Sequence, residues 1–311
     1  MKAVRFHKYG DPGVLRDEDA DRPEPGAGEV LVEVAATSFN PVDATIRAGY
    51  LQQVFPLTLP HILGIDLAGT VAALGAGVTG WTVGDQVIGF LSMVADGAAA
   101  EFVTVPAQIL APAPTTIPLA HAAALPAAAQ TAWQALFENA ALDRGQRVLI
   151  NGAGGGVGGY AVQLAKQAGA FVIATASGRS AKSVRAQGAD QIIDYTATTP
   201  AEALTEPVDA VLNLVAAAEP DMVALTGLIR DGGVIVTTAT PAAGDPGREV
   251  RAVGMQLRTD ADRLAALAKR VDAGELSVDI SALYPLSQAA TVHELAAAGG
   301  IRGKVLLLPA P

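Results

Sequence analysis

Residues 147–159 place a short apolar run directly before a cluster of glycines, and the glycines directly before a segment with helical spacing. After the glycines, apolar residues recur at the three- and four-residue spacing of a helix face, at Val157, Tyr160, Ala161, Leu164, Ala165 and Ala168. Glycines permit a tight turn and let the backbone approach a pyrophosphate, whose charge is met by the free N–H groups and dipole of the helix. This stretch therefore predicts a strand–turn–helix unit with a phosphate-binding turn.

The dinucleotide-binding pattern G-x-G-x-x-G has alanine in its first glycine position here, because the in-register residues are Ala153, Gly155 and Gly158. A glycine-rich connection without a ligand is the alternative. The preceding strand and following helix are the context that the motif requires. We therefore expect Ala153, Gly155, Gly156, Val157 and Gly158 to bind a cofactor.

The bulk properties narrow the class of protein. The 311 residues are about two domains long, and the net charge of −10 without a Lys/Arg run disfavours nucleic acid as a partner. The absence of cysteine excludes disulfides, thiolate metal sites and a cysteine nucleophile. No apolar signal core opens the sequence, and no uninterrupted apolar run reaches the ~18 residues of a membrane span. We expect a cytoplasmic protein with no membrane partner.

The pattern along the chain predicts α/β architecture with two kinds of domain. In residues 1–118, apolar and polar residues alternate in short runs, and Gly/Pro turns separate the runs. This pattern is typical of a compact, mostly β domain. From residue 119 helices and apolar strands alternate, which predicts βαβ units and a doubly wound parallel sheet. The helices are expected at 119–140, 157–168, 180–187 and 219–229, and the strands at 147–151, 171–175, 191–193, 209–215 and 233–237. A closing strand at 303–308 is placed to complete the sheet of the first domain.

Several separated motifs follow one another along the chain, at 38–43, 46–49, 63–71, 83–87, 130–133, 153–158 and 302–305. On these motifs the chain resembles the medium-chain dehydrogenase/reductase superfamily, in its zinc-independent quinone oxidoreductase branch. The resemblance covers nearly the whole sequence. It implies a GroES-like catalytic domain of residues 1–118 and 259–311, a Rossmann NADP-binding domain of residues 119–258, and an active site where the two meet.

The chain departs from the zinc-dependent members of that superfamily. Those relatives place cysteine and histidine ligands near Asn40, around Asp66 and near Thr131, and none stands there in this sequence. A catalytic zinc needs at least three protein ligands, and the histidines are scattered singly, at His7, His61, His121 and His293. We expect no metal, which disfavours the zinc-dependent oxidation of alcohols.

The residues after the predicted strand 171–175 indicate which nicotinamide cofactor is used. NAD-selective sites place Asp or Glu there, whereas this chain has Ser177, Arg179 and Ser180, with Lys182 nearby. Arg179 offers planar donors suited to a 2′-phosphate, which favours NADPH. A solvated helix start is the alternative. By the resemblance Tyr195 lies near the adenosine phosphate or ribose; it reads equally as a packing residue.

The resemblance also implies residues near the nicotinamide. Asn40 faces its side of the cleft, Thr131 lies beside the ring, and Asn213, Val215 and Thr238 line the cofactor. Tyr50 is a candidate donor to substrate, and Lys304 a candidate near the cofactor. Other interpretations stay open. Asn40 before proline is also typical of a turn, and Tyr50 of an aromatic at a loop tip. Lys304 also fits an edge lysine that prevents aggregation, and Asp43 and Asp66 fit a role in bracing loops.

The chemistry that fits these residues is delivery of hydride from NADPH to a quinone or another α,β-unsaturated carbonyl. A 2-enoyl thioester reductase and a non-catalytic NADPH-binding protein are the alternatives. No tyrosine is followed four residues later by lysine, so the short-chain dehydrogenase pair is missing. Relatives suggest a homodimer whose interface continues the sheet through residues 233–238, a run that also reads as a buried strand.

Overall fold

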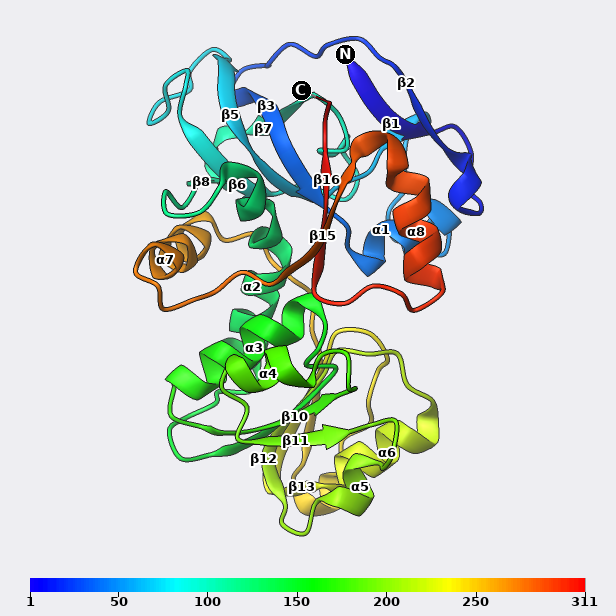
Figure 1. The fold of residues 1–311 in the computed structure, drawn as a ribbon, viewed down its shortest axis with the longest axis vertical. Coiled ribbons are helices and arrows are strands. Elements are labelled where there is room, and N and C mark those ends of the chain that lie inside the picture. Colours follow the sequence, from blue (N-terminus) through cyan, green and yellow to red (C-terminus); the bar gives the residue numbers. More distant parts are fainter. Residues whose placement is uncertain (311) are drawn as a thin grey trace. The chain divides into compact units, whose positions relative to one another are not determined.

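The computed structural model describes residues 1–310 and divides into two compact units (Figure 1). One unit contains Met1–Ala127 together with the chain from Thr259 onward, and the other contains Ala128–Arg258. The sequence-based boundary after residue 118 lies earlier in the chain. The difference arises because the short helix η3 (Leu119–Ala124) packs on strands β3 and β5 of the first unit.

The first unit contains two β-sheets. The three-stranded sheet has the order β2 (Leu15–Asp19), β1 (Lys2–Phe6), β4 (His61–Ile62). The seven-stranded sheet has the order β15 (Ile280–Pro285), β16 (Lys304–Leu308), β3 (Glu29–Ser38), β5 (Asp66–Leu74), β6 (Gln86–Phe90), β8 (Leu110–Pro112), with β7 (Phe102–Pro106) paired to β3. The closing strand therefore completes this sheet as the sequence predicts, since Leu306 pairs with Ser38 in antiparallel register.

Helices and apolar cores fill out this unit. Its helices are α1 (Pro41–Ala48), α7 (Ala261–Asp272) and α8 (Ala289–Ala297), with short turns η1 (Pro12–Val14), η2 (Ala107–Ile109) and η6 (Leu286–Gln288). One core lies among alternating residues of β3, β5, β6 and β7, including Val32, Leu67 and Val87. A second core joins β1, α1, α8 and β16 through residues such as Phe6, Ile46 and Val292. This second core packs the start of α1 beside β16.

The second unit is a six-stranded parallel sheet with helices on both faces. Its order is β11 (Gln191–Asp194), β10 (Phe171–Ala176), β9 (Arg147–Asn151), β12 (Val208–Asn213), β13 (Ile229–Thr237), β14 (Arg251–Gly254). The crossovers are α3 (Gly156–Gln167), α4 (Ala181–Ala186), α5 (Pro200–Ala203), α6 (Glu219–Gly227) and η5 (Pro246–Arg248). Because crossovers are right-handed, the reversal of order after β11 sends the later helices to the opposite face, and Figure 1 draws α3 and α4 apart from α5 and α6. This is the Rossmann strand order, so the predicted fold class is confirmed.

Two predicted elements differ in detail. The helix expected at 119–140 is η3, then α2 (Pro126–Trp133), then a π-helical segment (Gln134–Asn139). Pro126 begins α2 because proline tolerates the first helical position, and the Asn139 side chain donates to the Gln134 carbonyl within the wider π turn. The apolar run 233–238 lies mainly in β13, which pairs with β12 and β14, so it is an internal strand rather than a sheet edge.

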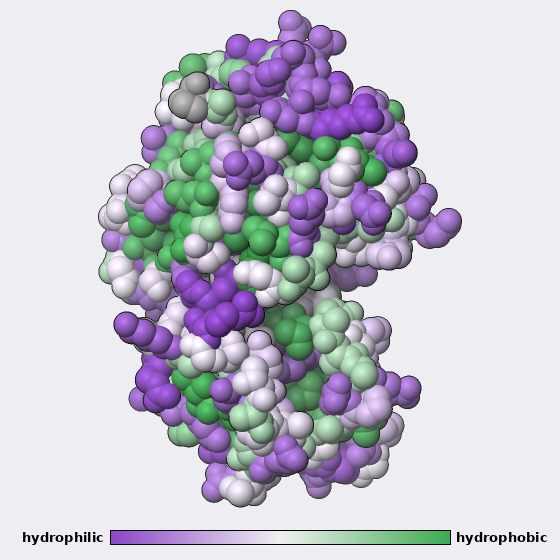
Figure 2. All heavy atoms as spheres, turned by 45° about the vertical axis from the view of Figure 1, so that its right-hand side comes forward, coloured by the Kyte–Doolittle hydropathy of each residue, from purple (hydrophilic) through white to green (hydrophobic). Residues whose placement is uncertain are grey.

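Among residues 1–310, no helix is long and apolar enough to cross a membrane. On the face drawn in Figure 2, hydrophilic and hydrophobic side chains are interspersed, and hydrophilic ones gather at the top of the view. Most apolar residues of the observed strands lie in the cores.

Candidate functional site

The glycine turn joins β9 to α3 in the geometry that the sequence predicts. Gly152 follows β9 with φ of +92°, a left-handed conformation that glycine adopts without strain. Gly155 is the N-cap of α3 and has no side chain to accept from the first helical N–H groups. Those N–H groups have no acceptor within the helix, so the turn presents donors and the positive end of the helix dipole to an anion.

Glycine is required at several places in this turn for different reasons. A Cβ at Gly158 would lie 2.5 Å from both Cα of Ala153 and the carbonyl oxygen of Gly152, so glycine lets α3 pack closely against the turn. A Cβ at Gly154 would clash with the Ser180 hydroxyl. At Gly155, by contrast, the nearest atom is the Gly152 oxygen at 3.4 Å. Packing within the protein does not demand glycine there, whereas close approach of a pyrophosphate does. The turn therefore fits a dinucleotide.

The segment after β10 lies beside this turn. Ser177 and Ser180 are buried, and the Ser180 N–H donates to the Ser177 carbonyl at 2.9 Å, which begins α4. Arg179 and Lys182 are exposed. No Asp or Glu stands at 177–182. Tyr195, just after β11, is 54% exposed. The segment thus presents an exposed cation next to the glycine turn, while its two small hydroxyl residues are buried.

The ends of β12 and β13 hold the remaining predicted cofactor residues. Asn213 is fully buried and its side chain contacts Asn151 and the Val215 carbonyl, so it faces its neighbours in the protein. Val215 and Thr238 are exposed, and the Thr238 N–H donates to the Asn213 carbonyl at 3.1 Å. The exposed pair and the buried Asn213 therefore occupy different positions at the same edge of the sheet.

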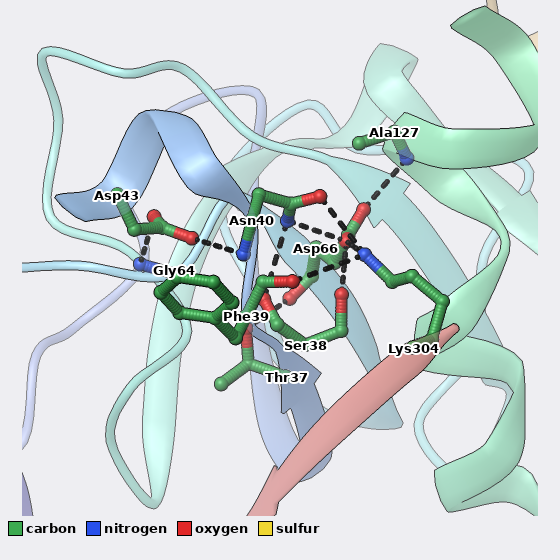
Figure 3. Close-up of polar contacts among 9 residues, drawn as sticks. All are labelled: Thr37, Ser38, Phe39, Asn40, Asp43, Gly64, Asp66, Ala127 and Lys304. Atoms are coloured by element: carbon green, nitrogen blue, oxygen red, sulfur yellow. Dashed lines mark hydrogen bonds and ion pairs between the residues drawn. The ribbon is translucent and has the colours of Figure 1, made fainter. Parts of the chain in front are cut away.

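A buried polar network centres on Asp66 in the first unit (Figure 3). One carboxylate oxygen, Oδ2, accepts from Ser38 Oγ, from Asn40 Nδ2 at 2.8 Å and from Lys304 Nζ at 3.1 Å. The other oxygen accepts from the N–H of Ala127 at 2.6 Å, in the first turn of α2. The carboxylate therefore joins β3, β5, β16 and α2, and its charge near the first turn of a helix is favourable.

The lysine of this network is not an edge residue. Lys304 opens β16, which lies between β15 and β3, and its side chain is 4% exposed. Besides Asp66, its ammonium donates to Asn40 Oδ1 at 2.8 Å and to the Phe39 carbonyl at 3.3 Å. A role in blocking aggregation needs an exposed edge, so burial in this network removes that interpretation.

Asn40 is held on both sides of its amide. It is the N-cap of α1, as expected for an asparagine before proline, and its Nδ2 donates to Asp66 and to the Ser38 carbonyl at 3.2 Å. Its backbone N–H donates to Asp43 Oδ2 at 2.8 Å, and Asp43 Oδ1 accepts from the Gly64 N–H at 3.3 Å. Burial raises the pKa of Asp43 to about 7. Asp43 and Asp66 thus brace this region and orient Asn40.

The other two predicted catalytic residues lie outside this network. Tyr50 follows the C-terminal Gly49 of α1 and is 84% exposed. Thr131 lies on α2 in the second unit and is half-buried. Sequence reasoning did not identify Thr175 and Asn151, which hydrogen-bond directly below the glycine turn. The available signal was a polar residue at the end of each of two otherwise apolar strands.

The histidines do not converge. His7 contacts Glu18, His61 lies near Asp96, and His293 packs edge-on against the Phe39 ring. Within residues 1–310, no group of three or more His, Cys, Asp or Glu side chains is arranged to hold a metal ion. The side chains near Asn40 and Asp66 therefore do not supply the three ligands that a catalytic zinc needs.

Comparisons with known proteins agree with this architecture. An alcohol dehydrogenase GroES-like domain model matches residues 26–115, and a zinc-binding dehydrogenase model matches residues 187–307. The chloroplast envelope quinone oxidoreductase homolog of Arabidopsis thaliana is 33% identical over 99% of this chain and 98% of its own length. The NADPH-dependent alkenal/one oxidoreductase of the same plant is 32% identical, and the match covers 100% of this chain and 80% of the length of that relative. The quinone oxidoreductase structure from Coxiella burnetii has a TM-score of 0.91 at 34% identity, over 99% of both chains.

A GroES-like domain and a Rossmann domain with a glycine turn define a pyridine-nucleotide-dependent oxidoreductase that acts on a small-molecule substrate. Within that class, the chain belongs to the quinone oxidoreductase branch of the medium-chain dehydrogenase/reductase superfamily. The resemblance inferred from the sequence motifs is thereby confirmed, as is the expectation that the protein is an enzyme.

Proposed function

We propose that this enzyme uses NADPH, without zinc, to reduce quinones or other α,β-unsaturated carbonyls. The observation that carries the proposal is the pairing of the glycine turn with segment 177–180. The turn offers unpaired helix N–H groups to a pyrophosphate, and Arg179 is exposed in a segment without carboxylates. An Asp or Glu there would repel a 2′-phosphate and bond a free ribose hydroxyl, so the segment favours NADPH over NADH.

The chemistry of the donor groups supports a reaction without zinc. The sequence contains no cysteine, and Asn40 and Asp66, which stand where zinc-dependent relatives place ligands, are engaged with Lys304 and Ser38. The Lys304 ammonium lies within hydrogen-bond distance of both residues. It therefore takes the position that a metal cation would need beside them, and it supplies a positive charge itself. Zinc-assisted oxidation of alcohols is thus poorly served by these residues.

The substrate class follows from the reaction that the residues allow. When bound, a reduced nicotinamide supplies a hydride to an electron-poor carbon. The chain's part is then to hold the dinucleotide at the glycine turn, to exclude water, and to stabilise the oxygen that gains negative charge. The relatives named for quinones and for alkenals and alkenones support a conjugated carbonyl as the acceptor.

We propose that the contributing side chains are Asn40, Tyr50 and Thr131 near the substrate. For the cofactor we propose the turn residues 153 and 155–158, the segment 177–180, Tyr195, Val215 and Thr238, with Asn213 beneath them. Lys304 acts through Asn40 and Asp66, because its three ammonium protons are directed to the Phe39, Asn40 and Asp66 oxygens. A cytoplasmic homodimer is part of the same proposal.

The test is consumption of reduced cofactor by the purified enzyme with a quinone, an enone and an enoyl-CoA, each with NADPH and with NADH. We expect NADPH consumption with the quinone or the enone and slower consumption with NADH. Turnover of the enoyl-CoA alone would replace the proposal with a thioester reductase. NADPH binding without turnover of any acceptor would instead indicate a binding protein.

A further inference from the structure

The Rossmann sheet reverses its strand order between β9 and β12, which are neighbours in the sheet but not in the chain. In open α/β sheets, ligands bind at the carboxyl ends of strands at such a reversal. The last residues of these two strands, Asn151 and Asn213, lie opposite each other in register. Their side chains meet directly at this point, since Asn151 Nδ2 donates to Asn213 Oδ1 at 2.8 Å.

This amide pair is part of a longer chain of hydrogen bonds across three strand ends. The Gly152 N–H donates to Thr175 Oγ1 at 2.8 Å, and that hydroxyl donates to Asn151 Oδ1 at 2.8 Å. At the far end, Asn213 Nδ2 donates to the Val215 carbonyl at 2.9 Å. The bonds run in one direction, from Gly152 through Thr175, Asn151 and Asn213 to Val215.

The ends of this chain also touch each other. A Cβ at Gly152 would lie 2.6 Å from Cγ1 of Val215, so the Val215 side chain packs directly over Gly152. The chain of hydrogen bonds and this packing contact together form a closed ring. Gly152 opens the proposed pyrophosphate turn, and Val215 is an exposed residue on the other side of the strand-order reversal.

The direction of the bonds makes the ring depend on a single hydroxyl. A threonine hydroxyl has one proton and two lone pairs, and Thr175 gives the proton to Asn151 while it accepts from Gly152. The bond that the hydroxyl accepts fixes the N–H of Gly152, a residue in left-handed conformation. The bond that it donates fixes the orientation of the Asn151 amide. That orientation directs Asn151 Nδ2 to Asn213, and hence Asn213 Nδ2 to Val215.

We propose that Thr175, Asn151 and Asn213 are positioning residues that set the affinity of the glycine turn for the dinucleotide. Thr175 and Asn213 are 1% and 0% exposed, so they act through Gly152 and Val215 rather than by touching the ligand. The ring holds the two sides of the strand-order reversal at a fixed separation before the cofactor arrives. This inference rests on the proposed use of NADPH.

Three substitutions at one position test the ring. Thr175→Val keeps the shape of the side chain but removes the hydroxyl, which leaves the Gly152 N–H and Asn151 Oδ1 without their partner. Thr175→Ala removes both the hydroxyl and the methyl group, whereas Thr175→Ser retains the hydroxyl. The Kd for NADPH is measured by fluorescence titration, and kcat and KM by steady-state turnover. We expect Thr175→Val and Thr175→Ala to raise the Kd and KM about tenfold, because each leaves two part-buried polar groups without their partner. We expect kcat at saturating NADPH to stay within about twofold, and Thr175→Ser to resemble the wild type.

The outcomes separate this inference from the proposed function. If the wild type fails to bind NADPH, the proposed function fails. If the wild type binds NADPH and the valine and alanine variants bind it equally well, only the ring is overturned, even where both variants melt at a lower temperature. An equal loss in the serine variant also contradicts a role for the hydroxyl. Should Thr175→Val not fold, the Ser and Ala variants still differ from each other by the hydroxyl alone.

Discussion

Lys304 Nζ lies 3.1 Å from Asp66 Oδ2, and both side chains are buried although the two residues are 238 positions apart in the sequence. The contact joins the first residue of the closing strand β16 to the first residue of β5. Asn40 bonds to both partners, so the orientation of its amide depends on this ion pair. The pair thus connects the two ends of the first unit to the residue proposed to face the substrate.

The two charges of the ion pair are predicted to depend on each other for their contribution to stability. Lys304→Met leaves the Asp66 carboxylate buried without its cation, and Asp66→Asn leaves the ammonium without its anion. Each single variant is expected to lose about 3–5 kcal/mol of unfolding free energy, measured by urea denaturation. The double variant should lose clearly less than the sum of the two. Additive losses would show that the two side chains contribute independently.

The glycine turn is predicted to tolerate no side chain at position 158. Gly158→Ala places a methyl group against the Ala153 backbone and the Gly152 carbonyl, which should cost about 1–3 kcal/mol in unfolding free energy and weaken NADPH binding. The matched control is Gly178→Ala, since a Cβ there meets no atom within 4 Å. Urea denaturation of both variants checks the difference. An equal loss of stability in the control would contradict the packing argument.

Arg179→Ala is predicted to raise the KM for NADPH at least several-fold and to leave the KM for NADH nearly unchanged. The reason is that the guanidinium would pair with the 2′-phosphate, which NADH lacks. Lys182→Ala is the comparison, because Lys182 is also exposed but lies within α4 rather than in the segment before it. Steady-state kinetics with both cofactors provide the measurement. A KM for NADPH unchanged in Arg179→Ala would remove this residue from the site.

Acid is predicted to destabilise the protein in part through His293. Burial, with a smaller contribution from the charge of Arg47, lowers the pKa of His293 to about 3. The neutral ring is therefore favoured in the folded state, and its stabilising contribution, complete above about pH 6.5, is lost as the pH falls toward 3. Asp43 acts in the opposite direction, because its raised pKa adds stability as the pH falls from about 7 toward 4.

The His293→Leu variant isolates the histidine contribution, since Asp43 is present in both proteins. The difference in unfolding free energy between wild type and variant should shift in favour of the variant by up to about 1.4 kcal/mol for each pH unit below 6.5. Urea denaturation at several pH values between 4 and 7 measures it. A difference that does not change with pH would mean that His293 titrates normally in the folded protein.

Local patterns predicted much of the second unit. The apolar run before the glycines and the periodic residues after them give β9 and α3 within a residue of their observed ends, because a buried strand and an amphipathic helix each leave a periodic trace. The pattern could not divide residues 119–140 into η3, α2 and a π segment, because those breaks depend on η3 packing against β3 and β5.

The side-chain networks were less accessible to sequence reasoning. Lys304 was identified as a candidate residue, but its pairing with Asp66 depends on β16 returning to β3, and no local signal fixes that register. Likewise, Thr175 and Asn213 become neighbours of Asn151 only through the strand order β10, β9, β12. Residues whose role depends on contacts between distant strands were therefore missed, as Thr175 was, or named as candidates without their partners, as Lys304 and Asn213 were.

The most direct test of the proposed reaction is the fate of a deuterium label. Purified enzyme is supplied with NADPH that carries deuterium in both hydrogen positions at C4 of the nicotinamide and with an α,β-unsaturated ketone, and the product is examined by mass spectrometry and NMR. The proposal predicts a saturated ketone with deuterium on the β-carbon. A saturated ketone without deuterium, or no reduction of the conjugated carbonyls and quinones tested, would contradict it.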